Sequence, residues 1–382
     1  MNSELLKTKH GVSLLVMFLM GSSIVIGTAS DVKQDAWEAI ILSALFTAPV
    51  FLMYCRIMDN HKGKTMLEIL PELFGSIAGK VMIGLYVLYA LHLGILVVRN
   101  FTEFIQIVSL PETPMRVVAL VFSIVCIYAV KTGTFVLSRF AVFTVPIVLA
   151  FMILMTLFSM PDMHLSNLKP YFASGWIPML RNTYGAFSFP FGETVLFLFV
   201  FRAGNEYFKL KRVYFYALFI GCGAILMATL RNLLVLGSGL FGSYHFSSYV
   251  TAGLIDIGDI VQRIEILLSI VLIFTGLIKI SICLYVAVAG LSKIFNITDY
   301  KTITAPVGIF AAIYSYVVYG NTQEMFFWAA YVYPYYAMPF QLLIPLVIWI
   351  TSEIKTKIEK NKMGKTEKIR TDDIKVVPVI TQ

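Results

Sequence analysis

Apolar stretches separated by short polar segments dominate the chain from residue 12 to residue 350. A helix needs about 20 mostly apolar residues to cross the hydrocarbon core of a bilayer. The pattern predicts ten transmembrane helices, over residues 12–29, 37–55, 81–108, 117–130, 140–160, 184–201, 213–236, 264–291, 303–319 and 331–350. The sequence therefore predicts an all-α, polytopic membrane domain over residues 1–351, followed by a charged cytoplasmic tail over residues 352–382.

Composition excludes a water-soluble protein. Hydrophobic residues make up 58% of the 382-residue chain and charged residues only 14%, with a mean hydropathy of +0.81. The net charge of +8 does not indicate nucleic acid binding, because Lys and Arg gather in short loops and one tail and do not interleave with exposed aromatics. The scattered Cys and His residues predict no disulfide, metal or cofactor, and the chain carries no GxSxG, P-loop or HExxH motif. We therefore expect no enzyme.

The charges between the predicted helices indicate an orientation. Cytoplasmic loops of membrane proteins carry excess Lys and Arg. With a cytoplasmic N-terminus, the segments on the other side hold only Lys33, Arg116, Lys169 and Arg181. All other basic loop residues and the basic tail then lie on the cytoplasmic side, which predicts cytoplasmic N- and C-termini and an even number of spans.

Two predicted spans carry glycine or proline near the middle of the membrane. The first contains Gly21-Ser22-Ser23-Ile24-Val25-Ile26-Gly27, and the sixth contains Phe189-Pro190-Phe191-Gly192-Glu193. Pro190 removes a backbone donor and disrupts the preceding turn, and Gly192 permits backbone conformations closed to other residues. We therefore expect helices one and six to be discontinuous.

The position of the two breaks suggests a binding site. Backbone groups freed in hydrocarbon cost several kcal/mol each, so breaks persist where protein or a polar cavity satisfies them. Spans one and six occupy corresponding places in two five-helix halves, the arrangement that marks the binding site of secondary transporters. Amides near Gly21–Ile24 are then expected to bind a ligand carboxylate. The alternative is that these glycines only allow close helix packing.

Charged residues deep in the membrane sharpen this expectation, since each is costly there unless it is paired. Glu193 lies in the broken sixth span and Lys279 in the eighth, so we hypothesise that they pair. Arg99 and Glu103 are four residues apart and are expected to pair along one helix. For Arg231, Arg263 and Glu265, snorkelling or an outer gate suffices. Further ligand contacts are predicted on the third and eighth spans, where packing is the alternative: Tyr89, Leu93, Thr275, Ser281 and Tyr285.

Several short motifs, in order, resemble the spore germination permease family. They are Asp35-Ala36-Trp37, Arg99-Asn100-Phe101-Thr102-Glu103, Asn167-Leu168-Lys169-Pro170, Phe189-Pro190-Phe191-Gly192-Glu193, Ile257-Gly258-Asp259 with Arg263 and Glu265, and Lys279-Ile280-Ser281. The resemblance covers residues 7–350. It implies an inverted five-plus-five helix fold of the amino acid, polyamine and organocation transporter superfamily.

The resemblance also implies a role in sporulating bacteria. Members of this family are B subunits of nutrient germinant receptors, which assemble with A and C subunits in the inner spore membrane. We therefore expect the chain to bind a small nutrient, with an amino acid favoured, and to trigger spore germination. Glu193 and carbonyls near Phe189 are expected to bind the ligand's ammonium group. The alternatives are an amino acid transporter coupled to protons or sodium, and an ion or water conduit opened by partners.

Overall fold

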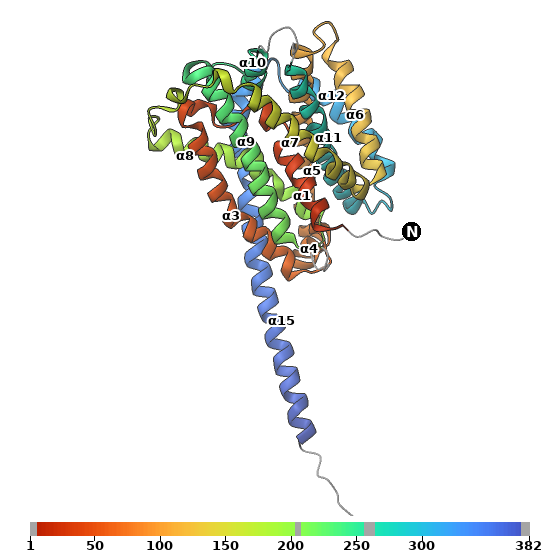
Figure 1. The fold of residues 1–382 in the computed structure, drawn as a ribbon. Helices are drawn as coiled ribbons and strands as arrows, with labels where there is room; N and C mark the ends of the chain where they lie inside the picture. Colours follow the sequence, from red (N-terminus) through yellow and green to blue (C-terminus); the bar gives the residue numbers. More distant parts are fainter. Residues whose placement is uncertain (1–5, 203–207, 256–263, 376–382) are drawn as a thin grey trace, which may run out of the picture.

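A computed structural model describes residues 6–202, 208–255 and 264–375 (Figure 1). Helices are the only regular elements in these ranges, and they form one bundle from which the last helix projects. The main helices are α1 (Thr8–Met20), α2 (Ser23–Ile26), α3 (Ala36–Asn60), α4 (Met66–Phe74), α5 (Ser76–Val108), α6 (Met115–Thr132), α7 (Thr134–Phe158), α8 (Trp176–Ala186), α9 (Leu210–Phe241), α10 (Ser247–Gly253), α11 (Glu265–Phe295), α12 (Lys301–Val317), α13 (Thr322–Phe327), α14 (Tyr333–Met338) and α15 (Ile344–Lys375). Shorter segments join some of them, namely η1 (Ser30–Asp35), η2 (Met160–Asp162), η3 (Leu165–Leu168), η4 (Phe187–Phe191), η5 (Gly192–Phe199), η7 (Trp328–Val332) and η8 (Pro339–Leu343).

Eight helical segments in the described ranges are long and apolar enough to cross a membrane. They match the predicted spans except the sixth and the ninth. The sixth is divided among α8, η4 and η5, and α12 in the ninth has 17 residues. The fold is therefore that of a multi-pass helical membrane protein, while the count of ten spans and the five-plus-five repeat remain predictions.

The first helix forms the centre of the bundle. Every residue of α1 from Leu14 to Met20 has 0% of its surface exposed, and α1 packs against α7, α9 and α11. A helix that is apolar on all sides is stable only when it is surrounded. The break that follows α1 is consequently held in the middle of the protein.

The peripheral helices present apolar side chains outward. Exposed residues of α6 and α7 include Leu120, Val121, Tyr128, Phe143 and Ile153. Apolar patches of this extent are rare on soluble monomers. They form the surface that faces lipid in a membrane protein.

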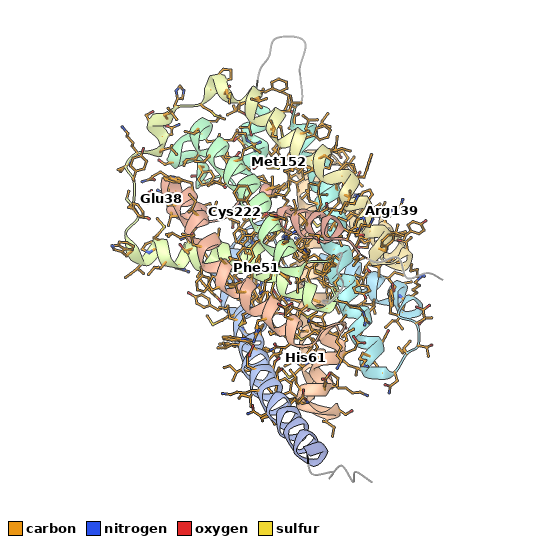
Figure 2. The ribbon with its side chains drawn as sticks, turned by 60° about the horizontal axis from the view of Figure 1, so that its bottom comes forward. Glu38, Phe51, His61, Arg139, Met152 and Cys222 are labelled. Carbon is orange, nitrogen blue, oxygen red and sulfur yellow. The ribbon has the colours of Figure 1, made fainter. Side chains whose placement is uncertain are left out.

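One end of the bundle carries α4 and the start of the projecting part of α15 (Figure 1). His61 lies at this end, beyond the last residue of α3 (Figure 2). Burial lowers the pKa of His61, and its Nε2 lies 3.0 Å from Ser352 Oγ. Arg56 pairs with Glu353 at 2.5 Å. These contacts fix the base of α15 against α3.

The tail begins as a continuation of the last span. The predicted boundary at residue 351 falls inside α15, which runs without interruption to Lys375. Adding a residue to an existing helix is far easier than starting a new one, and Lys and Glu are good helix formers. A charged segment that lacks the apolar content to fold alone is therefore helical here.

Close packing between α5 and α11 predicts a stability effect. A Cβ atom added at Gly290 would collide with Val87, whereas one added at Gly223 of α9 would meet nothing within 4 Å. We expect Gly290→Val to destabilise the protein by about 1–3 kcal/mol through overpacking, measured as a lower melting temperature in detergent. Gly223→Val is the matched control, and equal melting temperatures for the two variants would contradict the packing described.

Candidate functional site

The first break lies between α1 and α2, at Gly21 and Ser22. Gly21 has backbone angles φ 18° and ψ −127°, outside the helical region. Its carbonyl accepts a hydrogen bond from Thr275 Oγ1 of α11 at 3.1 Å. A Cβ at Gly21 would lie 2.5 Å from the Lys279 side chain, so glycine here lets α11 approach the break closely.

Side chains satisfy the groups that this break frees. Ser23 Oγ donates back to the carbonyls of Leu19 and Met20 at the end of α1. Ser248 Oγ of α10 donates to the Ile24 carbonyl at 2.6 Å, and Asn232 of α9 donates to Ser248 Oγ. Ser22 Oγ is buried and has no hydrogen-bond partner. One hydroxyl at the break therefore remains available.

The second break follows α8. Phe189 has extended angles (φ −131°, ψ 108°) inside the π-helical turn η4, and the chain continues as the 3₁₀ segment η5. Gln341 of η8 donates from Nε2 to the Ser188 carbonyl at 2.9 Å. A Cβ at Gly192 would collide with the Gln341 side chain. Gly192 therefore allows the tenth span to dock against the broken sixth.

A buried ion pair joins the two breaks. Lys279 Nζ lies 2.5 Å from Glu193 Oε2, and both side chains are 0% exposed. The ammonium group also lies 4.7 Å from the ring centre of Phe189 and 5.2 Å from that of Phe18. Aromatic faces attract cations. The hypothesised pairing of Glu193 with Lys279 is thus confirmed.

A hydrogen-bond chain continues from the pair into the tenth span. The Tyr333 hydroxyl donates to Glu193 Oε1 at 2.7 Å. It lies 3.1 Å from the Tyr89 hydroxyl, which accepts from Gln341 Nε2 at 2.8 Å. The Glu193 carboxylate thus has an ion-pair contact on one oxygen and a hydrogen bond on the other, which offsets part of the cost of burying its charge.

A small cavity of about 30 Å³ lies beside Glu193. Leu93, Asn100, Phe189 and Tyr333 are among the residues that line it. This is room for only a few water molecules. A ligand the size of an amino acid must therefore displace side chains or separate the ion pair to enter.

The structure brings most of the predicted ligand-contacting residues together. Grouped around the two breaks, the ion pair and the adjoining cavity are Gly21, Ser22, Ser23, Ile24, Tyr89, Leu93, Phe189, Pro190, Phe191, Gly192, Glu193, Thr275 and Lys279. Gly27, with φ 80°, follows α2 and lines a second cavity nearby. No group of three or more His, Cys, Asp and Glu residues that could hold a metal ion occurs in the described parts of the chain.

Two predicted residues lie elsewhere. Ser281 follows Lys279 by two residues, which places it on the opposite side of α11. Tyr285, on the same side as Ser281, packs edge-on against Tyr300. A four-residue spacing had correctly placed these two on one face, but that face contacts α6 and α12 and not the ion pair.

The other membrane charges divide into three cases. The predicted pair of Arg99 and Glu103 is confirmed at 2.9 Å. Arg231 does not reach the surface, as snorkelling would require, because it is 1% exposed and bonds Asn232. Arg263 and the Ile257-Gly258-Asp259 motif lie outside the described residues.

Sequence reasoning missed the contribution of the tenth span. Tyr333 donates to Glu193 and Gln341 donates to the Ser188 carbonyl. Tyr54 and Tyr86 donate to the carbonyls of Gln341 and Phe340. The signal was present, since Gln341 is a lone amide in an apolar run. In hydrocarbon such a group needs a partner.

The ion pair predicts a double-mutant effect. Removing one charge leaves the other buried and unpaired, so Glu193→Gln or Lys279→Met alone should cost about 3–5 kcal/mol. The combined variant should be more stable than either single variant. The melting temperatures of the four purified proteins in detergent test this, and a double variant no more stable than the worse single one would show that the two charges are not coupled.

The comparisons with known proteins agree with this architecture. The spore germination protein family matches residues 5–323. Spore germination protein KB of Bacillus subtilis (strain 168) is 28% identical over 359 residues, which cover 93% of this chain and 96% of the relative. Spore germination protein A2 of the same bacterium is 24% identical over 92% of this chain and 97% of its own.

A solved structure shares the fold. The crystal structure of MhsT in complex with L-phenylalanine aligns with a TM-score of 0.61 and 14% identity, over 91% of this chain and 96% of that chain. The chain belongs to the spore germination protein family.

Proposed function

We propose that this chain is the membrane subunit of a nutrient germinant receptor, which binds an amino acid between the two helix breaks and so triggers spore germination. The observation that carries the proposal is the ion pair of Lys279 and Glu193, which is fully buried at the point where both breaks meet. A packed apolar interior needs neither charge. The pair is, however, the complement of a zwitterion.

The site offers binding partners for both charged groups of an amino acid. Its carboxylate would bind Lys279, with further donors from Ser22 and the first amides of α2, and its ammonium group would bind Glu193. Ser22 Oγ and Ser188 Oγ are buried without partners, so they provide unused hydrogen-bonding capacity. Separating the ion pair costs free energy. Two charge-assisted hydrogen bonds to the ligand offset that cost. The family relationship and the fold shared with MhsT support this assignment.

Signalling follows from the contacts of the tenth span. Gln341 donates to the Ser188 carbonyl of the broken sixth helix, and Tyr333 donates to the Glu193 carboxylate. A ligand that replaces these contacts binds the two arrangements of the tenth span with different affinity, which is the requirement for shifting their populations. In the proposal, the A and C subunits of the receptor detect that shift.

The proposal places the protein in the inner spore membrane with both termini in the cytoplasm. At the α4 end, Arg56, Lys64, Arg202 and Lys211 all lie close to carboxylates of neighbouring segments. Excess Lys and Arg mark the cytoplasmic side of membrane proteins. We therefore assign the α4 end to the cytoplasm.

A ligand screen tests the function. Thermal shift of the purified chain against amino acids, sugars and nucleosides should find an amino acid that stabilises it, by an amount that grows with the logarithm of its concentration over Kd. The double variant Glu193→Gln/Lys279→Met should lose this shift. Lys293→Met, on the exposed end of α11, is the control and should keep it.

Germination and uptake measurements distinguish a sensor from a transporter. Deleting the gene should abolish germination in response to the same amino acid, and the double variant should not restore it. Uptake of labelled amino acid into proteoliposomes that contain this chain alone would instead favour the transporter. Stabilisation by sugars but by no amino acid would contradict the proposed ligand class.

The positive charge of Lys279 also disfavours sodium binding at the first break. In transporters, unwound carbonyls at such a break bind a cation. Here the Gly21 carbonyl is occupied by Thr275, and an ammonium group is fixed beside the break. A second positive charge at this distance would be repelled strongly in low dielectric.

We therefore expect amino acid binding to be independent of sodium. The thermal shift should be the same in equal concentrations of sodium chloride and choline chloride. A shift seen only in sodium would identify a cation site that Lys279 does not exclude, and would favour the sodium-coupled transporter.

A further inference from the structure

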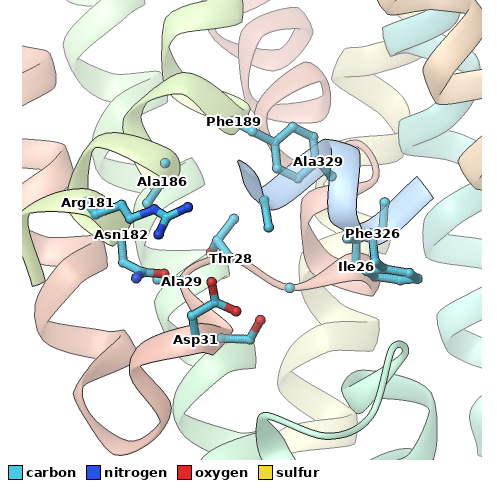
Figure 3. Close-up of a pocket in the computed structure, with 14 residues that line it drawn as sticks. Ile26, Thr28, Ala29, Asp31, Arg181, Asn182, Ala186, Phe189, Phe326 and Ala329 are labelled. Atoms are coloured by element: carbon cyan, nitrogen blue, oxygen red, sulfur yellow. The ribbon is translucent and has the colours of Figure 1, made fainter. Parts of the chain in front are cut away.

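A second cavity, of about 80 Å³, is lined by Phe189, whose ring also lies 4.7 Å from the Lys279 ammonium (Figure 3). Its walls come from three separate segments: the loop after α2, the helix α8, and the start of the tenth span. Gly27 in that loop has φ 80°, which turns the chain away from α2 toward the cavity. The cavity is thus built between the two broken helices, at the end of the bundle opposite α4.

Two opposite charges face this cavity without pairing to each other. Arg181 of α8 and Asp31 of η1 both line it, and Figure 3 shows their charged groups directed inward. Neither belongs to an ion pair within 4.0 Å in the part of the chain that the structure describes. A guanidinium and a carboxylate held apart in one small cavity can each bind a ligand group.

Tyr331 holds the two charges in place. The Arg181 guanidinium carbon lies 4.5 Å from the centre of the Tyr331 ring, and the Tyr331 side chain also interacts with the Asp31 carboxylate. Stacking on a ring leaves the planar N–H groups of Arg free to donate. The charges are therefore positioned without being neutralised by each other.

A buried hydroxyl adds an independent indication of a ligand. Thr28 lines the cavity, is only 6% exposed, and its Oγ1 has no hydrogen-bond partner. A buried polar atom normally has a partner. Thr28 Oγ1 can supply one hydrogen bond to a polar molecule between Arg181 and Asp31.

Phe189 connects this cavity with the inner site. Its side chain lines both cavities, and the Lys279 ammonium lies 4.7 Å from its ring centre. Phe189 also has the extended backbone that interrupts the sixth span. A ligand in the outer cavity is therefore separated from Lys279 by one aromatic side chain.

We infer that the cavity of Arg181, Asp31 and Thr28 is a second binding site for a free α-amino acid, occupied before the ligand passes Phe189. Arg181 binds the carboxylate, Asp31 binds the ammonium group, and Ile26 and Phe326 contact the side chain. The order of occupation rests on the function proposed above. The inference that the site exists depends only on the charges that line it. These charges make it bind zwitterions more tightly than singly charged molecules.

Equilibrium dialysis of the full chain in lipid nanodiscs against each radiolabelled L-amino acid tests this inference. The wild type should bind two molecules per chain. Arg181→Gln and Asp31→Asn should each weaken the binding of one of the two molecules by about tenfold or more, because each removes a hydrogen bond to a charged group. Arg116→Gln and Asp162→Asn, at exposed positions, are the matched controls and should bind two.

Single-charge analogues provide the second measurement. If leucine binds, isoamylamine, which lacks the carboxylate, and 4-methylpentanoate, which lacks the ammonium group, should compete for the outer site at least about tenfold less well. Equal competition by either analogue would overturn recognition of a zwitterion. Loss of preference for leucine over isoamylamine in Arg181→Gln would support the assigned orientation.

The outcomes separate the two proposals. One molecule per chain, unaffected by Arg181→Gln and lost in Glu193→Gln/Lys279→Met, overturns the outer site and leaves the inner one. One molecule that survives the double variant and is lost in Arg181→Gln overturns the inner site and supports the outer one. Absence of binding by every amino acid overturns both.

Discussion

The structure depends on one constraint: a helix interrupted inside a membrane must find hydrogen-bond partners for the backbone it exposes. Each unsatisfied group costs several kcal/mol in hydrocarbon. Thr275 and Ser248 satisfy the carbonyls of the first break, and Gln341 satisfies the second. These side chains come from α11, α10 and η8, so the breaks determine which helices meet at the centre.

The ion pair of Glu193 and Lys279 joins the two breaks. A buried pair is often no more stabilising than apolar residues of the same size. Stability alone therefore does not explain why Glu193 and Lys279 are fully buried in the bundle. In the function proposed above, the two charges pair with each other when no ligand is bound, and a molecule that carries both charges itself would replace that pairing.

Sequence patterns predicted the membrane fold, the two breaks and the ion pair, because each depends on a local rule. Glycines beside hydroxyl residues mark the first break, and proline and glycine beside a carboxylate mark the second. Two deep opposite charges have few alternatives to pairing. Spacing along α11 did not tell which face meets the ion pair, and Ser281 and Tyr285 lie on the other face. Arg181 was counted as a loop residue because α8 begins at Trp176, in a stretch too polar and proline-rich to read as a span. The π-helical turns at η7 and η8 shift which residues face inward, and single-sequence periodicity does not detect such shifts.

The unbroken helix α15 gives the molecule a mechanical property. Gln341 lies at the ion-pair network, and the chain continues as helix from there to Lys375. At 1.5 Å per residue, this rod is about 50 Å long. The ion pair of Arg56 and Glu353 holds this helix against α3, and about 33 Å of it extends from Glu353 to Lys375. A tilt of about five degrees about that contact would move the far end by about 3 Å. The helix would then be a lever that turns a small rearrangement around one side chain into a displacement outside the membrane.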